Sequence, residues 1–280
     1  MNKKVSVVIP IYKVQPDEYE LVSFNQCLRI LNRHTICLVT HQNLDISYYT
    51  SILNDIQVSY HIEYFEKKYF ENVTGYNRLL LSCKFYGRFR KYKYMLIYQL
   101  DAYVFRDELD FWCDKGYDYI GGIWFDNFGT PQEGKEEWLP GNGGVSLRNI
   151  ESMYQLLGSR KPIKGIKSLL QKVMQSFQDN KKRAIISLFA LPLNLIGYRN
   201  NTRYLAKRII VNEDHFIVDA VILHKKKIPD VKDAILFSWD RSPEFLYDKY
   251  KKLPFICHAW HREDLPYQGN YKFWKTIIEC

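Results

Sequence analysis

Strand-like apolar runs alternate with helical patterns through residues 1–122, and this alternation restricts the fold more than any other feature. The β-prone runs lie at 5–12, 35–40, 58–65, 94–100 and 117–122. Between them, apolar residues recur at helical spacing, at 17–33, 45–54 and 73–89. Parallel strands that are linked by helices form an open sheet with helices on both faces. The sequence therefore predicts an α/β fold with a mostly parallel, Rossmann-like sheet.

The length and composition fit one folded protein of this class. Its 280 residues are 46% hydrophobic and 25% charged, which excludes general disorder. We expect a single domain over residues 1–280 that carries a basic helical segment near 155–210.

The start of the chain and the cysteines bear on location. The opening MNKKVSVVIPIYK has too few apolar residues for a membrane span and no cleavage site for secretion follows it. The six cysteines form no CxxC pair, so we expect reduced thiols. These features predict a cytoplasmic protein.

One carboxylate interrupts the β-prone stretch YMLIYQLDAYVF at 94–105. Burying an unpaired carboxylate costs several kcal/mol, so Asp101 needs a partner: an arginine, backbone N–H groups or a metal ion. Asp101 also follows the predicted strand at its carboxyl end, where open α/β sheets bind ligands. We expect a functional site here, with the partner left open by these residues alone.

A glycine-rich loop forms the second cluster, LPGNGGVSLRN at 139–149. Glycines permit close approach of the backbone to a ligand, although a plain tight turn would explain two of them. No GK[ST] follows, so the loop is not a phosphate P-loop. The candidate binding residues are Gly141, Asn142, Gly143, Gly144, Ser146 and Arg148.

Two further clusters hold titratable residues. NEDHF at 212–216 supplies Glu213 and Asp214, which could equally form a solvated helix N-terminus. FICHAWHRED at 255–264 supplies His258 and His261, which could equally be structural. No HExxH, Cys/His zinc spacing or GxSxG occurs, which excludes the usual zinc and serine-hydrolase motifs.

These four clusters, in this order, resemble nucleotide-sugar glycosyltransferases of the GT-A fold. The stretch YNRLLLSCKFYGRF…YMLIYQLDAYVFRDELDFWCDKGYDYIGG is especially similar to a bacterial family from polysaccharide-synthesis loci, long described as a domain of unknown function. The resemblance covers roughly residues 1–150 and 211–262. It implies a GT-A-like fold and a nucleotide-sugar-dependent, hexosyltransferase-like enzyme.

The resemblance also implies roles for individual residues. Asp101 would hold Mn²⁺ or Mg²⁺ on the donor diphosphate, with His258, or second His261, completing the metal site. Asp214, or less favoured Glu213, would deprotonate or orient the acceptor hydroxyl.

Other implied roles concern the loop and the diphosphate. The loop Gly141–Ser146 would pack on the donor sugar or the acceptor. One departure from the family pattern is Tyr103, which replaces the second acid of Asp-x-Asp. If no metal binds, Arg148 or Arg262 would have to stabilise the diphosphate.

The positive charge of the chain is concentrated in one segment. Residues 160–208 contain twelve basic residues against Asp179 alone, a net +11, while the rest of the chain carries −2. Within it, 181–208 holds a twelve-residue apolar stretch between basic flanks. This pattern predicts either a buried helix under a lysine-fringed face or a shallow insertion into anionic lipid. An anionic acceptor or nucleic acid is a third alternative, but no nucleic-acid motif is present.

Taken together, these features predict transfer of a sugar from a nucleotide-sugar donor to a hydroxyl of a bacterial surface polysaccharide or a lipid-linked oligosaccharide precursor. The enzyme would be cytoplasmic and peripheral at the inner face of the plasma membrane, without a nucleic-acid partner. Two alternatives stay open: a non-catalytic sugar-binding protein, and a sugar-1-phosphate nucleotidyltransferase. The sequence after the first strand, IPIYKVQPDEYE, lacks the glycine- and lysine/arginine-rich loop that the nucleotidyltransferase requires.

Overall fold

The computed structural model describes residues 3–125, 138–209 and 212–278. The N-terminal half contains β1 (Lys3–Pro10), α1 (Glu18–Leu31), β2 (Thr35–Thr40), α2 (Ser47–Asp55), β3 (Tyr60–Tyr64), η1 (Lys67–Tyr69), α3 (Val73–Leu80), α4 (Cys83–Arg88), β4 (Tyr92–Tyr98), β5 (Tyr103–Val104), α5 (Leu109–Asp114) and β6 (Tyr119–Gly121). The remainder contains β7 (Ile123–Phe125), β8 (Trp138–Pro140), β9 (Val145–Asn149), α6 (Ile150–Gly158), α7 (Ile166–Asp179), α8 (Lys181–Phe189), α9 (Leu191–Leu195), α10 (Thr202–Ala206), α11 (Glu213–Leu223), α12 (Val231–Phe237), β10 (Ser238–Trp239), α13 (Pro243–Tyr250), β11 (Ile256–Cys257) and α14 (Asn270–Trp274).

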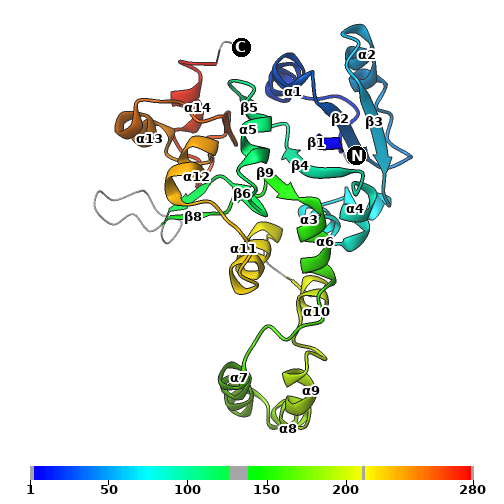
Figure 1. Ribbon diagram of the computed structural model, residues 1–280, viewed down its shortest axis with the longest axis vertical. Helices are drawn as coiled ribbons and strands as arrows, with labels where there is room; N and C mark the ends of the chain where they lie inside the picture. Colours follow the sequence, from blue (N-terminus) through cyan, green and yellow to red (C-terminus); the bar gives the residue numbers. More distant parts are fainter. Residues whose placement is uncertain (1–2, 126–137, 210–211, 279–280) are drawn as a thin grey trace.

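The central sheet has the strand order β3-β2-β1-β4-β9-β6 (Figure 1). β1 pairs in parallel with β2 and β4, and β2 pairs in parallel with β3. β9 runs antiparallel to both of its neighbours, β4 and β6. The prediction of an α/β fold with a mostly parallel, Rossmann-like sheet is therefore confirmed.

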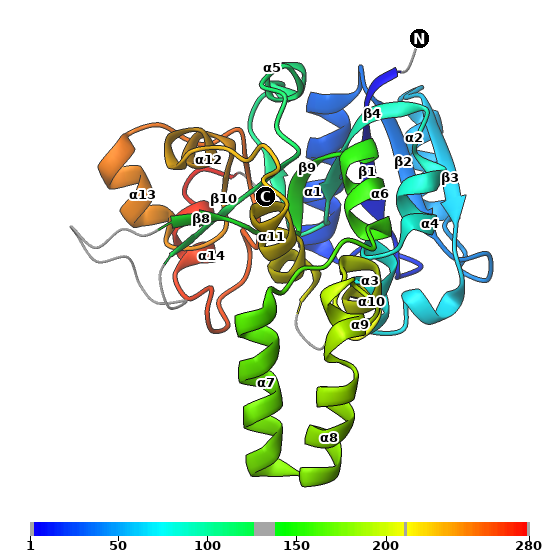
Figure 2. The same ribbon diagram turned by 60° about the horizontal axis from the view of Figure 1, so that its bottom comes forward.

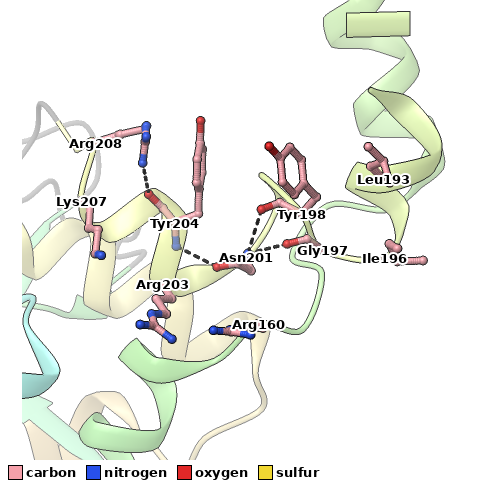
Figure 3. A pocket seen from close by; sticks show the side chains of 10 residues that line it. All are labelled: Arg160, Leu193, Ile196, Gly197, Tyr198, Asn201, Arg203, Tyr204, Lys207 and Arg208. Carbon is pink, nitrogen blue, oxygen red and sulfur yellow. Dashed lines mark hydrogen bonds between the residues drawn. The ribbon is translucent and has the colours of Figure 1, made fainter. Parts of the chain in front are cut away.

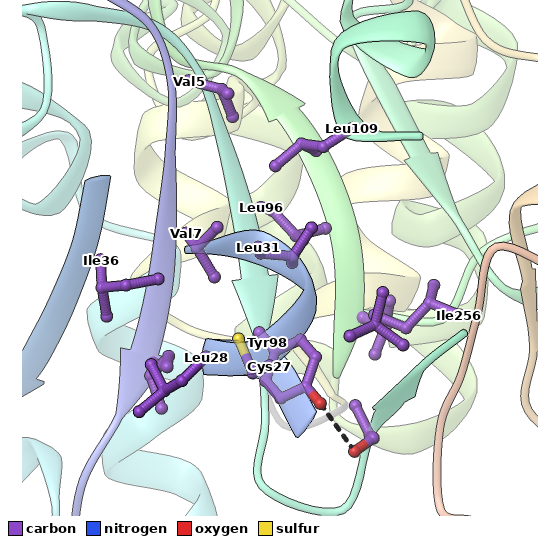
Figure 4. Packing of buried hydrophobic residues seen from close by; sticks show 14 of the residues in the cluster. Val5, Val7, Cys27, Leu28, Leu31, Ile36, Leu96, Tyr98, Leu109 and Ile256 are labelled. Carbon is purple, nitrogen blue, oxygen red and sulfur yellow. Dashed lines mark hydrogen bonds between the residues drawn. The ribbon is translucent and has the colours of Figure 1, made fainter. Parts of the chain in front are cut away.

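Helices cover both faces of this sheet, because apolar side chains of each strand point alternately to either side. On one face, Val7 and Leu96 of the strands share an apolar cluster with Leu28 and Leu31 of α1 (Figure 4). On the other face, strand residues such as Val8 cluster with side chains of α3, α4, α6 and α11. The continuous apolar runs of the sequence thus reflect burial on two sides.

Some predicted boundaries shift. The expected helix 73–89 is divided into α3 and α4, because the side chain of Ser82 accepts a hydrogen bond from the Phe85 N–H and starts a new helix. The expected strand 94–100 is β4, which ends at Tyr98. Asp101 therefore lies in the turn after the strand, where the hydrogen bond from the Ala102 N–H to the Gln99 carbonyl closes the chain.

A second, smaller sheet joins the C-terminal part to this turn. Its order is β10-β11-β5, with β11 antiparallel to β5. Because β5 follows Asp101 directly, the pairing brings the end of β11 beside the end of β4. An aromatic cluster that includes Trp239, Trp260 and Trp274 packs behind this small sheet.

The basic segment, residues 160–208, is hereafter called the arm. Its helices α7 and α8 project away from the sheet (Figure 2). The alternative of a buried helix is wrong, because α8 and α9 are separate short helices, and Ile186 and Phe189 are 63% and 79% exposed. No helix in the described ranges is long and apolar enough to cross a membrane.

The cysteines of the described residues are free: Cys27, Cys37, Cys83, Cys113 and Cys257. All but Cys83 are buried. Cys280 lies outside the described residues.

Candidate active site

Asp101 lies at the point where the strand order reverses. From β1 the chain moves outward to β2 and β3, and then returns to β4 on the other side of β1. Ligands bind beyond the carboxyl ends of strands at such a point. The Tyr98 hydroxyl holds the turn by donating to the carbonyl of Ala102, at 3.0 Å. The Asp101 side chain is 21% exposed, so it can be reached from solvent.

The HAW sequence brings His258 to Asp101 through a sharp turn. Ala259 has a φ of +52°, a conformation that costs a residue with a side chain about 1–2 kcal/mol. Two hydrogen bonds hold this turn: the Trp260 N–H donates to the Asp101 carbonyl, and the Trp260 indole N–H donates to the Ser23 hydroxyl. The direction of the imidazole is therefore set by the fold of the chain around it.

His258 lies between two carboxylates. Its Nε2 is 3.1 Å from Oδ1 of Asp101, and its Nδ1 is 2.7 Å from Oδ1 of Asp240. Burial opposes protonation of the ring, but the charge of Asp101 and its hydrogen bond, aided by Asp240, raise the pKa of His258 to about 10. The same contact outweighs burial and lowers the pKa of Asp101. The partner that the buried carboxylate needs is thus a histidine.

The donor set around Asp101 suits a divalent cation. Asp240 engages Nδ1, as the second partner of a liganding histidine usually does. Nε2 would therefore face a metal once it had released the proton that the raised pKa of the ring keeps on it. Two ligand atoms at about 2.1 Å from one ion lie roughly 3 Å apart, and the Asp101–His258 separation matches this. No group of three His, Cys, Asp or Glu side chains that could hold a metal occurs in the described part of the chain. Two protein ligands, with substrate phosphates and water, are nevertheless a sufficient set for Mg²⁺.

The glycine-rich loop packs against this histidine. A Cβ atom on Gly144 would lie 2.1 Å from Nε2 of His258, and one on Gly143 would lie 2.5 Å from Oε1 of Glu213. The Asn142 side chain caps the loop by accepting from the Gly144 N–H at 2.9 Å. Gly141 is held against the indole of Trp124, which would lie 2.2 Å from its Cβ. The glycines are therefore required by close contacts with the site, which a plain turn would not explain.

The first residues of α11 meet the other side of the loop. Asp214 Oδ2 accepts a hydrogen bond from the Gly143 N–H at 3.1 Å, and Oδ1 accepts from the His215 N–H at 2.8 Å. Burial nevertheless raises the pKa of Asp214. The side chain is only partly buried. It is thus a fixed carboxylate with raised basicity beside the loop.

Arg148, Ser146 and Glu213 face the protein interior. The Arg148 guanidinium is fully buried and donates to Oε1 of Glu213 at 2.9 Å, to the Ser146 hydroxyl at 2.8 Å and to the Tyr86 hydroxyl at 2.9 Å. These side chains hold the loop to α11, and the structure does not bring them to the exposed side of Asp101. Their predicted contact with the donor, and the role of Glu213 as a base, would require this network to open.

The remaining predicted residues surround the site without joining the Asp101–His258 pair. His261 stacks on Tyr19 with ring centres 5.0 Å apart. Arg262 donates to Asp264 at 2.9 Å. Tyr103 packs its ring against Phe105, so the position of the missing second acid belongs to the aromatic cluster.

Two site residues, Asp240 and Gln99, were not predicted. Asp240 is 2% exposed and orients His258, while Gln99 Oε1 lies 3.3 Å from His258 Nε2. The sequence held one indication, because Asp240 follows the apolar run AILFSW much as Asp101 follows β4. The sequence did not indicate the contact between Asp240 and His258, because the two residues lie far apart along the chain.

Several solved structures resemble this chain. Mouse xyloside xylosyltransferase 1 is 12% identical, with 92% of this chain and 97% of that chain covered and a TM-score of 0.46. Core-mannan synthase A of Aspergillus fumigatus, in a Mn/GDP form, is 8% identical, with coverage of 78% and 69% and a TM-score of 0.44. A glycosyltransferase involved in glycosylation of the major capsid of PBCV-1 is 11% identical, with coverage of 98% and 100% and a TM-score of 0.43.

No curated protein matches the sequence. One family profile matches residues 59–258, a range that contains the strand-end aspartate, the glycine loop, the first turn of α11 and His258. The family is described as a protein of unknown function, so any activity has to come from the chemistry of the site. Because the match spans more than half of the 280 residues, the chain belongs to the DUF5672 family.

Proposed function

We propose that the protein is a nucleotide-sugar-dependent glycosyltransferase. The observation that carries the proposal is the convergence of four separate chain segments on one edge of the sheet. The Asp101–His258 pair, the backbone of Gly143 and Gly144, and the carboxylate of Asp214 meet there. A cation site, a close-approach loop and a base are the parts that sugar transfer from a nucleoside diphosphate needs.

Asp101 and His258 would hold a divalent cation, Mn²⁺ or Mg²⁺, against the donor diphosphate. When bound, the ion neutralises charge on the departing nucleoside diphosphate. Asp240 keeps the His258 ring oriented through its 2.7 Å contact with Nδ1. Tyr103 supplies no carboxylate, so His258 would be the second protein ligand of the ion.

Asp214 would receive the proton of the acceptor hydroxyl. In the reaction the bond from the sugar C1 to the diphosphate oxygen breaks, the acceptor oxygen bonds to C1, and the nucleoside diphosphate leaves with the bonding electron pair. Burial raises the pKa of Asp214, which favours this role. The Gly143 N–H holds the carboxylate in place.

The substrates we propose are a hexose-type nucleotide sugar and a saccharide hydroxyl of a bacterial surface polysaccharide or its lipid-linked precursor. The resemblance of the four motifs to polysaccharide-locus enzymes supports this choice. A lipid-linked acceptor is also in keeping with the basic arm that follows α6.

The test measures the melting temperature with UDP, GDP, CDP and CMP, each with and without Mn²⁺, together with nucleotide release from matching nucleotide sugars. A ligand at about a hundred times its Kd stabilises the fold by roughly 2.7 kcal/mol. We expect one nucleotide to stabilise the protein only with metal. Asp101→Asn should abolish this shift, and Asp214→Asn should keep it while losing sugar transfer.

Asp219→Asn serves as the matched control, because Asp219 is an exposed acid on the same helix as Asp214. It should retain both the shift and the transfer. A metal-dependent shift that survives Asp101→Asn would refute the metal site. Transfer retained by a folded Asp214→Asn would refute the base. Pyrophosphate release from an NTP and a sugar 1-phosphate would instead identify a nucleotidyltransferase, and sugar binding without turnover would identify a binding protein.

A further inference from the structure

The arm is attached to the rest of the protein by a fixed junction. Asn200 is buried there, accepts from the Lys164 N–H at 2.9 Å and donates to the Lys164 carbonyl at 2.7 Å. The Arg203 N–H donates to the Ser159 carbonyl, which binds the returning chain to the end of α6. From this junction α7 and α8 extend beyond the rest of the molecule (Figure 2).

The arm exposes an unusual amount of apolar surface. Half of the large apolar side chains that are exposed in the described residues lie between Ile166 and Tyr198. On α7, Leu170, Met174 and Phe177 recur at helical spacing and are 40%, 70% and 43% exposed. Apolar patches of this kind mark binding surfaces rather than ordinary solvent-facing helices.

The charge of the arm identifies the kind of partner. Its twelve basic residues face a single acid, Asp179. A nonpolar protein partner would not need this charge, whereas the surface of an anionic bilayer attracts basic residues and accepts apolar side chains just below its headgroups. The short helices also fit, because none of them can span a membrane.

A cavity of about 540 Å³ lies at the base of the arm (Figure 3). Four basic residues line it: Arg160, Arg203, Lys207 and Arg208. No acid is among its described lining residues. The rings of Tyr198 and Tyr204 point in the same direction (Figure 3), and the Arg208 guanidinium carbon lies 3.8 Å from the Tyr204 ring centre. Arginine forks and a lysine without a nearby acid are suited to phosphate.

We propose that the arm docks on the surface of an anionic phospholipid bilayer. The apolar edges of α7 and α8 insert among the headgroups, and the basic pocket at the base receives a headgroup phosphate. The docking stands apart from sugar transfer; its use for presenting a lipid-linked acceptor rests on the proposed function.

The chain connects this surface closely to the candidate active site. Only five residues lie between Arg208 in the pocket and Asp214 at the start of α11, a distance of six residue steps along the chain. A chain of that length spans at most about 20 Å. A docked protein would therefore hold its candidate base near the bilayer surface.

The experiment is sedimentation of the full-length protein with phosphatidylcholine vesicles that contain or lack phosphatidylglycerol. We expect binding only to the anionic vesicles, weakening as salt rises. Each basic residue near such a surface contributes about 1 kcal/mol, so Lys207→Gln with Arg208→Gln should weaken binding roughly thirtyfold. Ile186→Ser with Phe189→Ser should weaken it at least about tenfold through lost apolar burial.

Matched controls separate these effects from general loss of charge or apolar surface. Lys232→Gln with Lys252→Gln removes two exposed lysines of the C-terminal part, and Ile56→Ser with Phe111→Ser removes two exposed apolar side chains away from the arm. Both pairs should bind vesicles as the wild type does. Melting temperatures confirm that each variant is folded.

Four results would overturn the proposal. Equal binding to neutral and anionic vesicles would show that anionic headgroups are not recognised. Binding of both arm variants at the wild-type level would show that the arm is not the docking surface. A dimer in sedimentation equilibrium that the Ile186/Phe189 variant dissociates, with no vesicle binding, would assign the surface to a second copy. Inorganic phosphate that stabilises the pocket without any vesicle binding would assign the pocket to a soluble phosphate. Sugar-transfer assays do not enter these outcomes, so failure here leaves the proposed function untouched.

Discussion

Two helices of equal length, α1 and α7, show how differently the sheet region and the arm are stabilised. Both contain 14 residues. α1 begins with a capping box between Asp17 and Glu20 and buries Phe24, Leu28 and Leu31 against the sheet. α7 begins at Gly165 without a side-chain cap, and of its apolar residues only Leu169 and Val173 are buried. Most helices in proteins are stabilised by packing of an apolar face. The apolar face of α7 is only partly buried against the rest of the chain.

The charged side chains also differ between the sheet region and the arm. In the sheet region the buried charges are paired, as Arg148 is with Glu213 and His258 with Asp101 and Asp240. In the arm, basic residues outnumber the one acid and cannot be neutralised internally. The sheet region thus provides the stability of the fold and a fixed site, while the arm exposes apolar and basic side chains to the solvent.

The largest effect that tests this division is expected from Arg148. Arg148→Met removes one partner of a buried pair and leaves Glu213 unpaired, which costs about 3–5 kcal/mol. The arm counterpart Arg199→Met changes an exposed side chain and should alter the unfolding free energy by less than about 0.5 kcal/mol. Urea denaturation of the two variants measures the contrast.

A double variant shows whether the cost comes from the unpaired charge. Arg148→Met with Glu213→Gln removes the charge that the single variant leaves behind, so part of the lost stability should return. Equal losses in the Arg148 and Arg199 variants would contradict the division between the two regions.

The sequence predicted the sheet region better than its site. Apolar, β-prone runs located every strand of β1 to β4, because burial on two faces leaves a strong pattern. The positions of Asp101, Asp214 and His258 were also predicted. The resemblance also placed Asp101 and His258 in one site. The contact between Asp240 and His258 was not predicted, because it depends on the pairing of two-residue strands that have no periodicity.

The arm was harder to predict for a related reason. The twelve-residue apolar stretch fits a buried helix as well as an exposed one, because periodicity does not say whether a face finds a partner in the same chain. The break between α8 and α9 coincides with Pro192 near the start of α9, a residue that favours a helix start. The sequence therefore indicated where the helix breaks. It could not indicate that the helices are exposed, because exposure depends on the tertiary structure.

The second prediction compares two glycines, Gly144 in the loop and Gly165 in the arm. Gly144→Ala would place Cβ 2.1 Å from Nε2 of His258, so the imidazole or the loop must move. A displacement of about 1 Å at a catalytic group can cost roughly hundredfold in rate, and we expect sugar transfer to fall by about that factor. Metal-dependent stabilisation by the nucleotide should weaken as well.

Gly165 in the arm serves as the control for Gly144. Gly165 has an ordinary φ of −74° and no atom within 4 Å of an added Cβ. Gly165→Ala should therefore leave transfer unchanged and change the unfolding free energy by less than about 1 kcal/mol, because the gain through the unfolded state is opposed by the poorer fit of alanine at the N-cap of α7. Full activity in Gly144→Ala would mean that the loop does not contact His258 as described.

The smallest expected effect concerns two histidines, one in the sheet and one beside the arm. Burial, with help from Lys91 and Lys3, lowers the pKa of His61 from 6.5 to about 4, and its Nε2 has no hydrogen-bond partner among the described residues. Burial also lowers the pKa of His224, whose Nε2 lies 3.1 Å from the Thr202 hydroxyl of α10. In both, folding favours the neutral ring.

The sign of the pH dependence follows from this. A histidine with a lowered folded pKa gives its full stability above about pH 6.5, and for His61 that stability is lost as the pH falls toward 4. His61→Phe keeps a ring to stack on Tyr92 but cannot titrate, so it should reduce the loss of unfolding free energy between pH 7 and pH 5. His224→Gln should reduce it less, because the ring lies at the junction with the arm and its surroundings are more exposed. A pH dependence unchanged by His61→Phe would show that the sheet edge does not hold this histidine neutral, and a larger effect of His224→Gln would place the acid-sensitive contact at the arm instead.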